Sequence, residues 1–281
     1  AAGAQVRAFA RSADKLQTLV QQGAQPVLGD VLDPRALTDA LRGSDVAYLM
    51  VPPRYDAADP IAYYDQVASS LAAAIGESGV RRVVLLSSLG AELSAGTGIV
   101  VGLNHVEQKL KALPRLDLLI LRAGYFYENF LGSIGLIQSM GVNGGATKGD
   151  VPIPMIAAGD IGDLAAKAIL AGDFTGVHEL VGPRDLTMVE ATRILGKMIG
   201  KPELAYQQFP DAAVIAGLQQ AGFSEGTAKS FVGMSEAFNA GRVRTSQPRS
   251  AQNTGKITFE EFAGEFAQAY AALSMPREES T

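Results

Sequence analysis

The first candidate binding group directly follows a stretch with the alternating pattern of a β-strand and consists of Arg11, Ser12 and Lys15. The strand is predicted over residues 5–10, and Ser12 is placed to cap a helix over residues 13–22. In a dinucleotide-binding βαβ unit the end of the second strand faces the adenosine ribose, where an arginine suits a 2′-phosphate and an acid suits a free 2′-hydroxyl. An arginine at a strand end is also commonly just solvated, so the rest of the chain must decide between these two roles.

Two later strands also end in groups that could contact a ligand. Residues 81–88 have the composition of a fully buried strand that ends in two serines, and hydroxyls at the carboxyl end of a central parallel strand lie where such sheets bind ligands. The strand predicted over residues 117–122 is followed by three aromatic side chains and an amide, those of Tyr125, Phe126, Tyr127 and Asn129. These side chains could line a binding wall, or the aromatic ones could belong to the core.

Composition excludes several kinds of chemistry. The chain has no cysteine, which excludes disulfides, thiolate catalysis and cysteine-bound metals, and its two histidines are too few for most catalytic zinc sites. A net charge of -5 gives no electrostatic basis for binding nucleic acid. No apolar run is long enough for a membrane span, and the first residues do not read as a signal peptide. We therefore expect a cytoplasmic protein without a metal site, a nucleic-acid partner or a membrane partner.

The elements that position these groups alternate between strands and helices, which predicts an α/β fold with a parallel sheet. At 281 residues and 47% hydrophobic content, the chain can form one large α/β domain with an appended lobe. The glycine-rich residues 141–149 follow a helical stretch and lack the strand-loop-helix setting of a phosphate loop, so we expect a flexible substrate-side loop there.

Several of these segments together resemble the NmrA-like branch of the atypical short-chain dehydrogenases/reductases. The most specific piece is the run Leu121-Arg-Ala-Gly-Tyr-Phe-Tyr-Glu-Asn129. Weaker matches accompany it at residues 6–11, 29–30, 87–88, 106–108, 160–163 and 182–183. The resemblance covers nearly the whole chain and implies a Rossmann-type doubly wound parallel sheet over residues 1–150, with residues 151–281 completing the sheet and forming a small C-terminal α/β lobe on the substrate side.

The same resemblance implies a set of residues that bind the cofactor. Arg11 and Ser12 would hold the 2′-phosphate with Lys15 as a second charge, so NADPH is the expected cofactor and NADH a possible one. The resemblance further implies that the adenine, the two riboses and the nicotinamide are bordered in turn by Asp30 and Val31, by Val51 and Pro52, by Ser87, and by Ala123 to Tyr127.

Two features depart from the superfamily pattern. Residues 1–4 contain neither a first strand nor the glycine-rich loop that lets the backbone approach a pyrophosphate. We expect that the sequence is truncated before this point. The alternative is a protein that binds dinucleotides poorly. The chain also lacks a Tyr-x-x-x-Lys motif. Asn104 or His105, near the start of the matching helix, could supply the ribose contact or a proton, although His105 could equally be an exposed helix residue.

These observations predict a flavin-independent NAD(P)H oxidoreductase that transfers hydride to a small aromatic substrate such as a quinone or an azo compound. Such acceptors need little acid assistance, which suits a site without the motif lysine. Tyr127 and His105 are the candidate proton donors. Substrate contacts are expected from Tyr125, Phe126, Tyr127 and Asn129. A dinucleotide-binding redox sensor without turnover and a reductase of a biosynthetic intermediate are the alternatives, and the protein is expected to be a monomer or a homodimer.

Overall fold

The computed structural model describes residues 3–274, and its main body is a parallel sheet. Four strands run parallel in the order β3 (Ala47–Leu49), β4 (Arg82–Ser88), β5 (Asp117–Ala123) and β9 (Gly176–Leu180). A second parallel pair consists of β1 (Arg7–Ala10) and β2 (Gln25–Leu28). Within the described residues no ladder joins β1 to β3. The α/β fold with parallel strands predicted from the sequence is confirmed.

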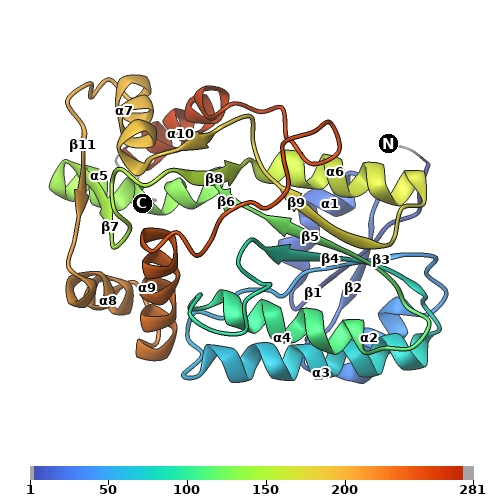
Figure 1. Cartoon of the computed structure of the whole chain (residues 1–281). Coiled ribbons are helices and arrows are strands. Elements are labelled where there is room, and N and C mark those ends of the chain that lie inside the picture. Colours follow the sequence, from blue (N-terminus) through green and yellow to red (C-terminus); the bar gives the residue numbers. More distant parts are fainter. Residues whose placement is uncertain (1–2, 275–281) are drawn as a thin grey trace, which may run out of the picture.

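Helices cover both faces of the sheet, and β4 shows why (Figure 1). Val83 and Leu85 of β4 pack into the core beneath one set of helices, whereas Val84 packs into the core that contains Ile161 and Leu164. Because neighbouring side chains of a strand point to opposite faces, an unbroken apolar strand needs a cover on each side. The first set is α2 (Pro34–Leu41), α3 (Pro60–Ser78) and α4 (Val100–Lys111), and the opposite face carries α6 (Ala158–Ala171).

The segment after β1 differs from the predicted helix. Residues 13–22 form a short 3-10 helix, η1 (Ala13–Leu16), followed by a single α-helical stretch, α1 (Gln17–Gln21). Ser12 occupies the N-cap position of η1, but its side chain makes no capping hydrogen bond. The Ser12 hydroxyl is therefore not committed to the helix end.

A smaller lobe lies beside the carboxyl ends of the main strands (Figure 1). It contains the three-stranded sheet β10 (Asp185–Leu186), β8 (Ile153–Ile156) and β6 (Tyr125–Phe126), and the parallel pair β7 (Val142–Gly145) and β11 (Ala205–Gln208). Its helices are η2 (Tyr127–Ser133), α5 (Ile134–Met140), α7 (Met188–Met198), α8 (Asp211–Gln220), α9 (Glu225–Asn239) and α10 (Phe259–Ser274). The prediction of a flexible loop over residues 141–149 is wrong for its first half, because residues 142–145 pair along their length with β11.

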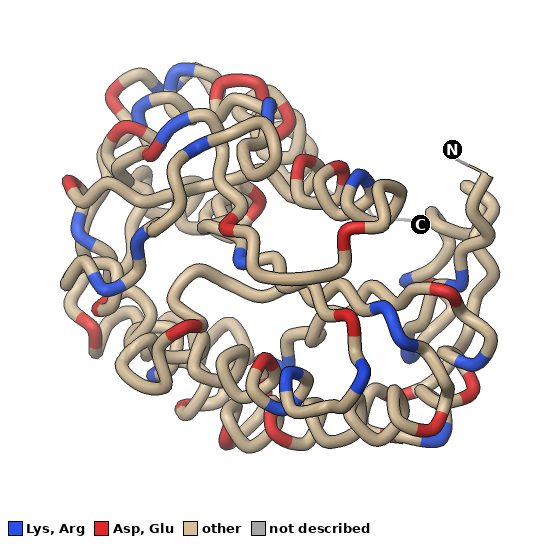
Figure 2. The backbone as a smooth tube through the Cα atoms, turned by 45° about the vertical axis from the view of Figure 1, so that its right-hand side comes forward, with Lys and Arg blue, Asp and Glu red and all other residues tan. Residues whose placement is uncertain are grey.

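Lys and Arg are interspersed with Asp and Glu along the backbone (Figure 2). The helices of residues 3–274 include none long and apolar enough to cross a membrane. The division at residue 150, the oligomeric state and the absence of a nucleic-acid partner stay predictions.

Candidate functional site

The predicted cofactor residues lie at one edge of the main body. Parallel strands end at the same edge, and Arg11 follows β1, Asp30 follows β2, and Val51 follows β3. Gly29 donates its backbone N–H to the Ala10 carbonyl at 3.0 Å, which draws the ends of β1 and β2 together. A Cβ at position 29 would lie 2.6 Å from the ring of Phe9, so any larger residue here would have to displace that ring.

A tyrosine that the sequence analysis missed organises this edge. Tyr63 is buried at the start of α3, and its hydroxyl donates to the Pro52 carbonyl at 3.0 Å. The guanidinium carbon of Arg54 lies 5.7 Å from the centroid of the same ring. Burial raises the pKa of Tyr63, while the nearby charges of Arg11 and Asp30 lower and raise it, respectively. Arg54 therefore lies over this buried ring, and Arg11 and Asp30 are near enough for their charges to act on its pKa.

The basic groups at this edge are available to an anion. Arg11 and Lys15 are exposed, and within residues 3–274 neither side chain has a carboxylate partner. The carboxylate of Asp30, by contrast, accepts the backbone N–H of Leu32 at 2.9 Å and stabilises the turn after β2. Unpaired guanidinium and ammonium groups beside an uncommitted serine hydroxyl form a donor set that fits a phosphate monoester.

A buried ionic network lies at the ends of β4 and β5. The carboxylate of Glu107 on α4 is fully buried and accepts the Ser87 hydroxyl at 2.7 Å. The guanidinium of Arg122 binds the two oxygens of that carboxylate at 3.0 and 2.7 Å, and Lys111 donates to it at 3.0 Å. Burial alone raises the pKa of Glu107, but the hydrogen bonds from Arg122, Ser87 and Lys111 together lower it below its ordinary value. The Ser87 hydrogen is thus committed to a carboxylate that remains charged at neutral pH.

The loop after β4 is fixed by the same network. Arg122 reaches Glu92 at 3.3 Å, and the Glu92 carboxylate accepts the backbone N–H of Gly90 at 3.1 Å. Asn104, predicted to contact a ribose, is buried and donates its amide to the Ala91 carbonyl at 2.8 Å. In this structure its side chain holds the loop, and a ribose contact by it stays a prediction.

His105 pairs with a residue of the neighbouring helix α3. The matching helix begins at Val100, so His105 is in its second turn and not at its start. Its Nδ1 atom lies 2.8 Å from a carboxylate oxygen of Asp65 on α3, the helix that runs beside α4. The pair connects two helices on one face of the sheet, and the role of His105 as a proton donor stays a prediction.

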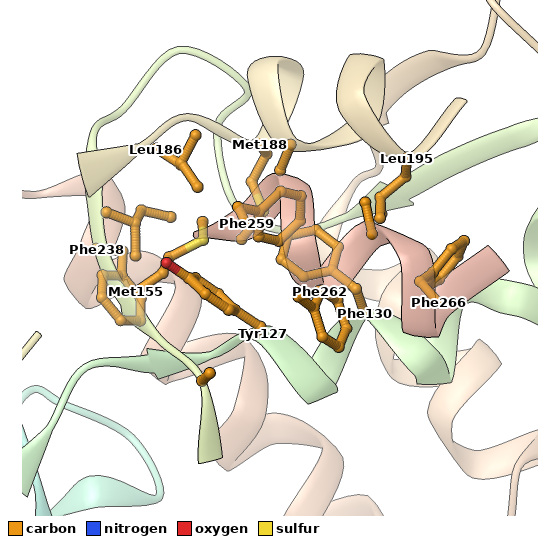
Figure 3. Close-up of a cluster of buried hydrophobic side chains, with 14 of the residues drawn as sticks. Tyr127, Phe130, Met155, Leu186, Met188, Leu195, Phe238, Phe259, Phe262 and Phe266 are labelled. Atoms are coloured by element: carbon orange, nitrogen blue, oxygen red, sulfur yellow. The ribbon is translucent and has the colours of Figure 1, made fainter. Parts of the chain in front are cut away.

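The aromatic run after β5 belongs mainly to the core. Tyr127 is 1% exposed and packs with Phe259 and Phe262 of α10 (Figure 3). Burial raises the pKa of Tyr127 to about 12. The structure places this ring among apolar side chains, and the roles of Tyr127 as a proton donor and substrate contact stay predictions.

The neighbours of Tyr127 divide between two cores. Tyr125 is half-buried and makes edge contacts with Phe130 and Phe238, whereas Phe126 packs against the core of α6. Ala123 is buried in β5. The three rings therefore pack in different cores, and of the predicted substrate residues Asn129 is the exposed one.

Substitution of the two candidate proton donors tests their roles. We expect His105→Gln and Tyr127→Phe to leave kcat for NADPH oxidation essentially unchanged, since His105 pairs with Asp65 and the Tyr127 ring packs against α10. Removing a true general acid lowers the rate by about 100-fold or more. Steady-state kinetics with one quinone compares kcat of the variants with that of the wild type. A thermal melt shows that each variant is folded. A loss of that size in either variant would support the substituted residue as the proton donor.

Comparison with known proteins assigns this arrangement to a family. The model of the NmrA-like family matches residues 1–263. The chain belongs to the NmrA-like family. It is 30% identical over 228 residues to quinone oxidoreductase 2 of Escherichia coli strain K12, covering 80% of this chain and 75% of that protein. It is 25% identical over 197 residues to an NAD(P)H azoreductase of Xenophilus azovorans, covering 70% of this chain and 66% of that protein.

A solved structure gives the same result for the fold of this NmrA-like protein. The NADPH complex of an NADPH-dependent quinone oxidoreductase from Escherichia coli is similar with a TM-score of 0.78 and 25% identity, over 94% of this chain and 91% of that one. This similarity confirms the Rossmann-type fold that the resemblance implied.

Proposed function

We propose that the protein is a flavin-independent NAD(P)H oxidoreductase that prefers NADPH and reduces a conjugated aromatic acceptor, a quinone or an azo compound. The general class, an NAD(P)H-dependent oxidoreductase, rests on the quinone oxidoreductase and azoreductase relatives. The observation that carries the finer proposal is the unpaired Arg11 at the end of β1, with Lys15 on the next turn, in a fold shared with an NADPH-binding relative.

The residues around the strand ends fit the successive parts of NADPH, which supplies the hydride when bound. Arg11, Ser12 and Lys15 would hold the 2′-phosphate. Asp30 and Val31 would border the adenine, Val51 and Pro52 the adenosine ribose, and Ser87, Ala123 and Tyr125 the nicotinamide end. Arg54 and Tyr63 join this set because they lie on the same edge.

The nicotinamide end supports an acceptor that needs little acid assistance. The Ser87 hydrogen is donated to Glu107, the Tyr127 ring is enclosed, and His105 pairs with Asp65. A quinone takes one hydride and delocalises the negative charge over its conjugated system, and a proton from water completes the hydroquinone. An azo bond takes two hydrides and two protons from water to give two amines. Asn129 is exposed and could anchor a polar group of either acceptor.

The test is oxidation of NADPH by the purified protein with a panel of quinones and azo dyes. We expect acceptor-dependent loss of the NADPH absorbance, with hydroquinone or amine as product and without added flavin. If NADPH binds tightly but no acceptor in the panel is reduced, the redox-sensor alternative replaces the enzyme. Turnover restricted to a non-aromatic carbonyl or imine substrate would favour a biosynthetic reductase.

A further inference from the structure

The helical hairpin formed by α8 and α9 contacts the segment that follows β3, residues 50–59, which we call the β3 loop. Figure 1 shows α9 reaching from the lobe to the helices beneath the main sheet. The backbone N–H of Ser224 donates to the Tyr55 carbonyl at 2.9 Å. The hydroxyls of Ser224 and Thr227 both donate to the carbonyl of Ala57, at 2.5 and 2.9 Å. The first turn of α9 therefore holds the β3 loop by three hydrogen bonds.

Close packing accompanies these hydrogen bonds. The ring of Tyr55 stacks on Phe223 with a centroid distance of 4.5 Å and lies 6.2 Å from Phe231. Gly226 lies so close to the loop that a Cβ there would be 2.0 Å from the Ala58 carbonyl oxygen. Thr227 is 2% exposed, so its hydroxyl needs the partner that Ala57 provides. The contact requires a glycine in the helix.

The other end of the β3 loop belongs to the proposed cofactor edge. Val51 is buried against the main core, and the Pro52 carbonyl is fixed by the Tyr63 hydroxyl. Arg54 then lies over the Tyr63 ring, and its Nε atom is 3.5 Å from Asp56. Between Tyr63 on one side and the hairpin on the other, the short chain from Pro52 to Ala57 is held at both ends.

We propose that Thr227 and Ser224 are positioning residues for the cofactor, acting through the β3 loop. By holding the Ala57 carbonyl, they keep Pro52 and Arg54 in the arrangement that borders the adenosine part of NADPH. The inference rests on the proposed function for the identity of the cofactor. It adds that residues of the lobe, far along the chain from the cofactor edge, set the affinity of that edge.

Coupling between two sites is reciprocal. If a loosened hairpin weakens NADPH binding, bound NADPH must stabilise the contact between hairpin and loop by the same factor. Hydrogen exchange should therefore slow at the backbone amides of residues 224–231 when NADPH is added. A merely structural contact would not show this response.

Three variants test the proposal through the Kd of NADPH, measured by fluorescence titration without an acceptor. Thr227→Val keeps the shape of the side chain but loses the donor, and we expect the Kd to rise about threefold to tenfold, in line with the loss of one hydrogen bond. Thr227→Ser keeps the donor and should restore the wild-type Kd. Gly226→Ala should raise the Kd further, because its Cβ would separate the helix from the loop.

Gly217→Ala is the matched control, since it lies in α8 with no atom within 4 Å of the added Cβ. Helix propensity alone stabilises both alanine variants by about 1 kcal/mol. The inference is overturned if the Kd is unchanged in Thr227→Val and Gly226→Ala, whether or not the Tm falls. It is also overturned if Thr227→Ser does not have the wild-type Kd. If the wild-type protein binds NADPH but reduces no acceptor, the proposed enzymatic activity is overturned. The Kd values of the variants for NADPH can still be compared in that case. A wild-type protein that does not bind NADPH overturns both.

Discussion

Replacing Arg122 by methionine is expected to lower the free energy of unfolding by about 3 kcal/mol, because it leaves the buried carboxylate of Glu107 without its main partner. The Glu107 side chain is fully buried, and Arg122 supplies two of its hydrogen bonds. Breaking a buried pair costs about 3–5 kcal/mol, and the lower end applies here because Lys111 and Ser87 still donate to the same carboxylate. Urea unfolding followed by circular dichroism measures the change.

Two control variants separate the buried charge from lost packing. The double variant Glu107→Leu, Arg122→Met removes both charges and should recover much of the stability lost in the single variant. Arg184→Met breaks a pair with Glu260 in which both side chains are about half-exposed, so its cost should be about 0–1 kcal/mol. If Arg122→Met costs no more than Arg184→Met, the network at the ends of β4 and β5 contributes no specific stability.

The pH dependence of unfolding is a second measurement of how much the buried Glu107 carboxylate contributes to stability. The pKa of Glu107 is lower in the folded protein than its ordinary value of 4.5. A carboxyl group with a lowered folded pKa adds stability that is present above its unfolded pKa and is lost as the pH falls through its folded pKa. The wild-type protein should therefore lose stability below about pH 4.5 more steeply than Glu107→Gln, which has no proton to take up at this position. Equal slopes would contradict the assignment.

How far the sequence predicts this site depends on whether the deciding contacts are local. The strand alternation around residues 5–10 and the apolar run of β4 depend on neighbours in sequence, and both strands form where predicted. The aromatic run at Tyr125 to Tyr127 is different, because its burial is decided by Phe259 and Phe262, which come from the far end of the chain. Local patterns show that the rings are present but not which element covers them.

His105 also depends on a contact that is distant in sequence. The sequence places it near the start of a helix, and that helix in fact starts at Val100. Its partner Asp65 comes from α3, and a local pattern does not show which two helices lie side by side. Of the two residues of the ionic network that were missed, Arg122 did have a signal in the sequence, because it is a charge inside an apolar strand. Charges in such positions require a buried partner.

The preference for NADPH over NADH should fall by about tenfold to a hundredfold in Arg11→Ala. A hydrogen bond to a charged partner contributes about 1.5–3 kcal/mol, and tenfold in kcat/KM corresponds to about 1.4 kcal/mol. NADH lacks the 2′-phosphate, so the loss should fall on kcat/KM for NADPH and leave the value for NADH nearly unchanged. The ratio of the two kcat/KM values, measured with one acceptor, is the readout.

Arg7→Ala is the control for this substitution. Arg7 lies in the same strand, but its guanidinium donates to the Arg42 carbonyl at 2.9 Å and to the Ser44 hydroxyl at 2.7 Å, at the other end of the strand from Arg11. Its removal should leave the ratio unaltered. Because Arg11 is exposed, added salt should weaken the preference of the wild-type protein and have little effect on Arg11→Ala. A ratio that is the same in the wild type and in Arg11→Ala would mean that the end of β1 does not recognise the phosphate, and Lys15 or Arg54 would then be the residue to test.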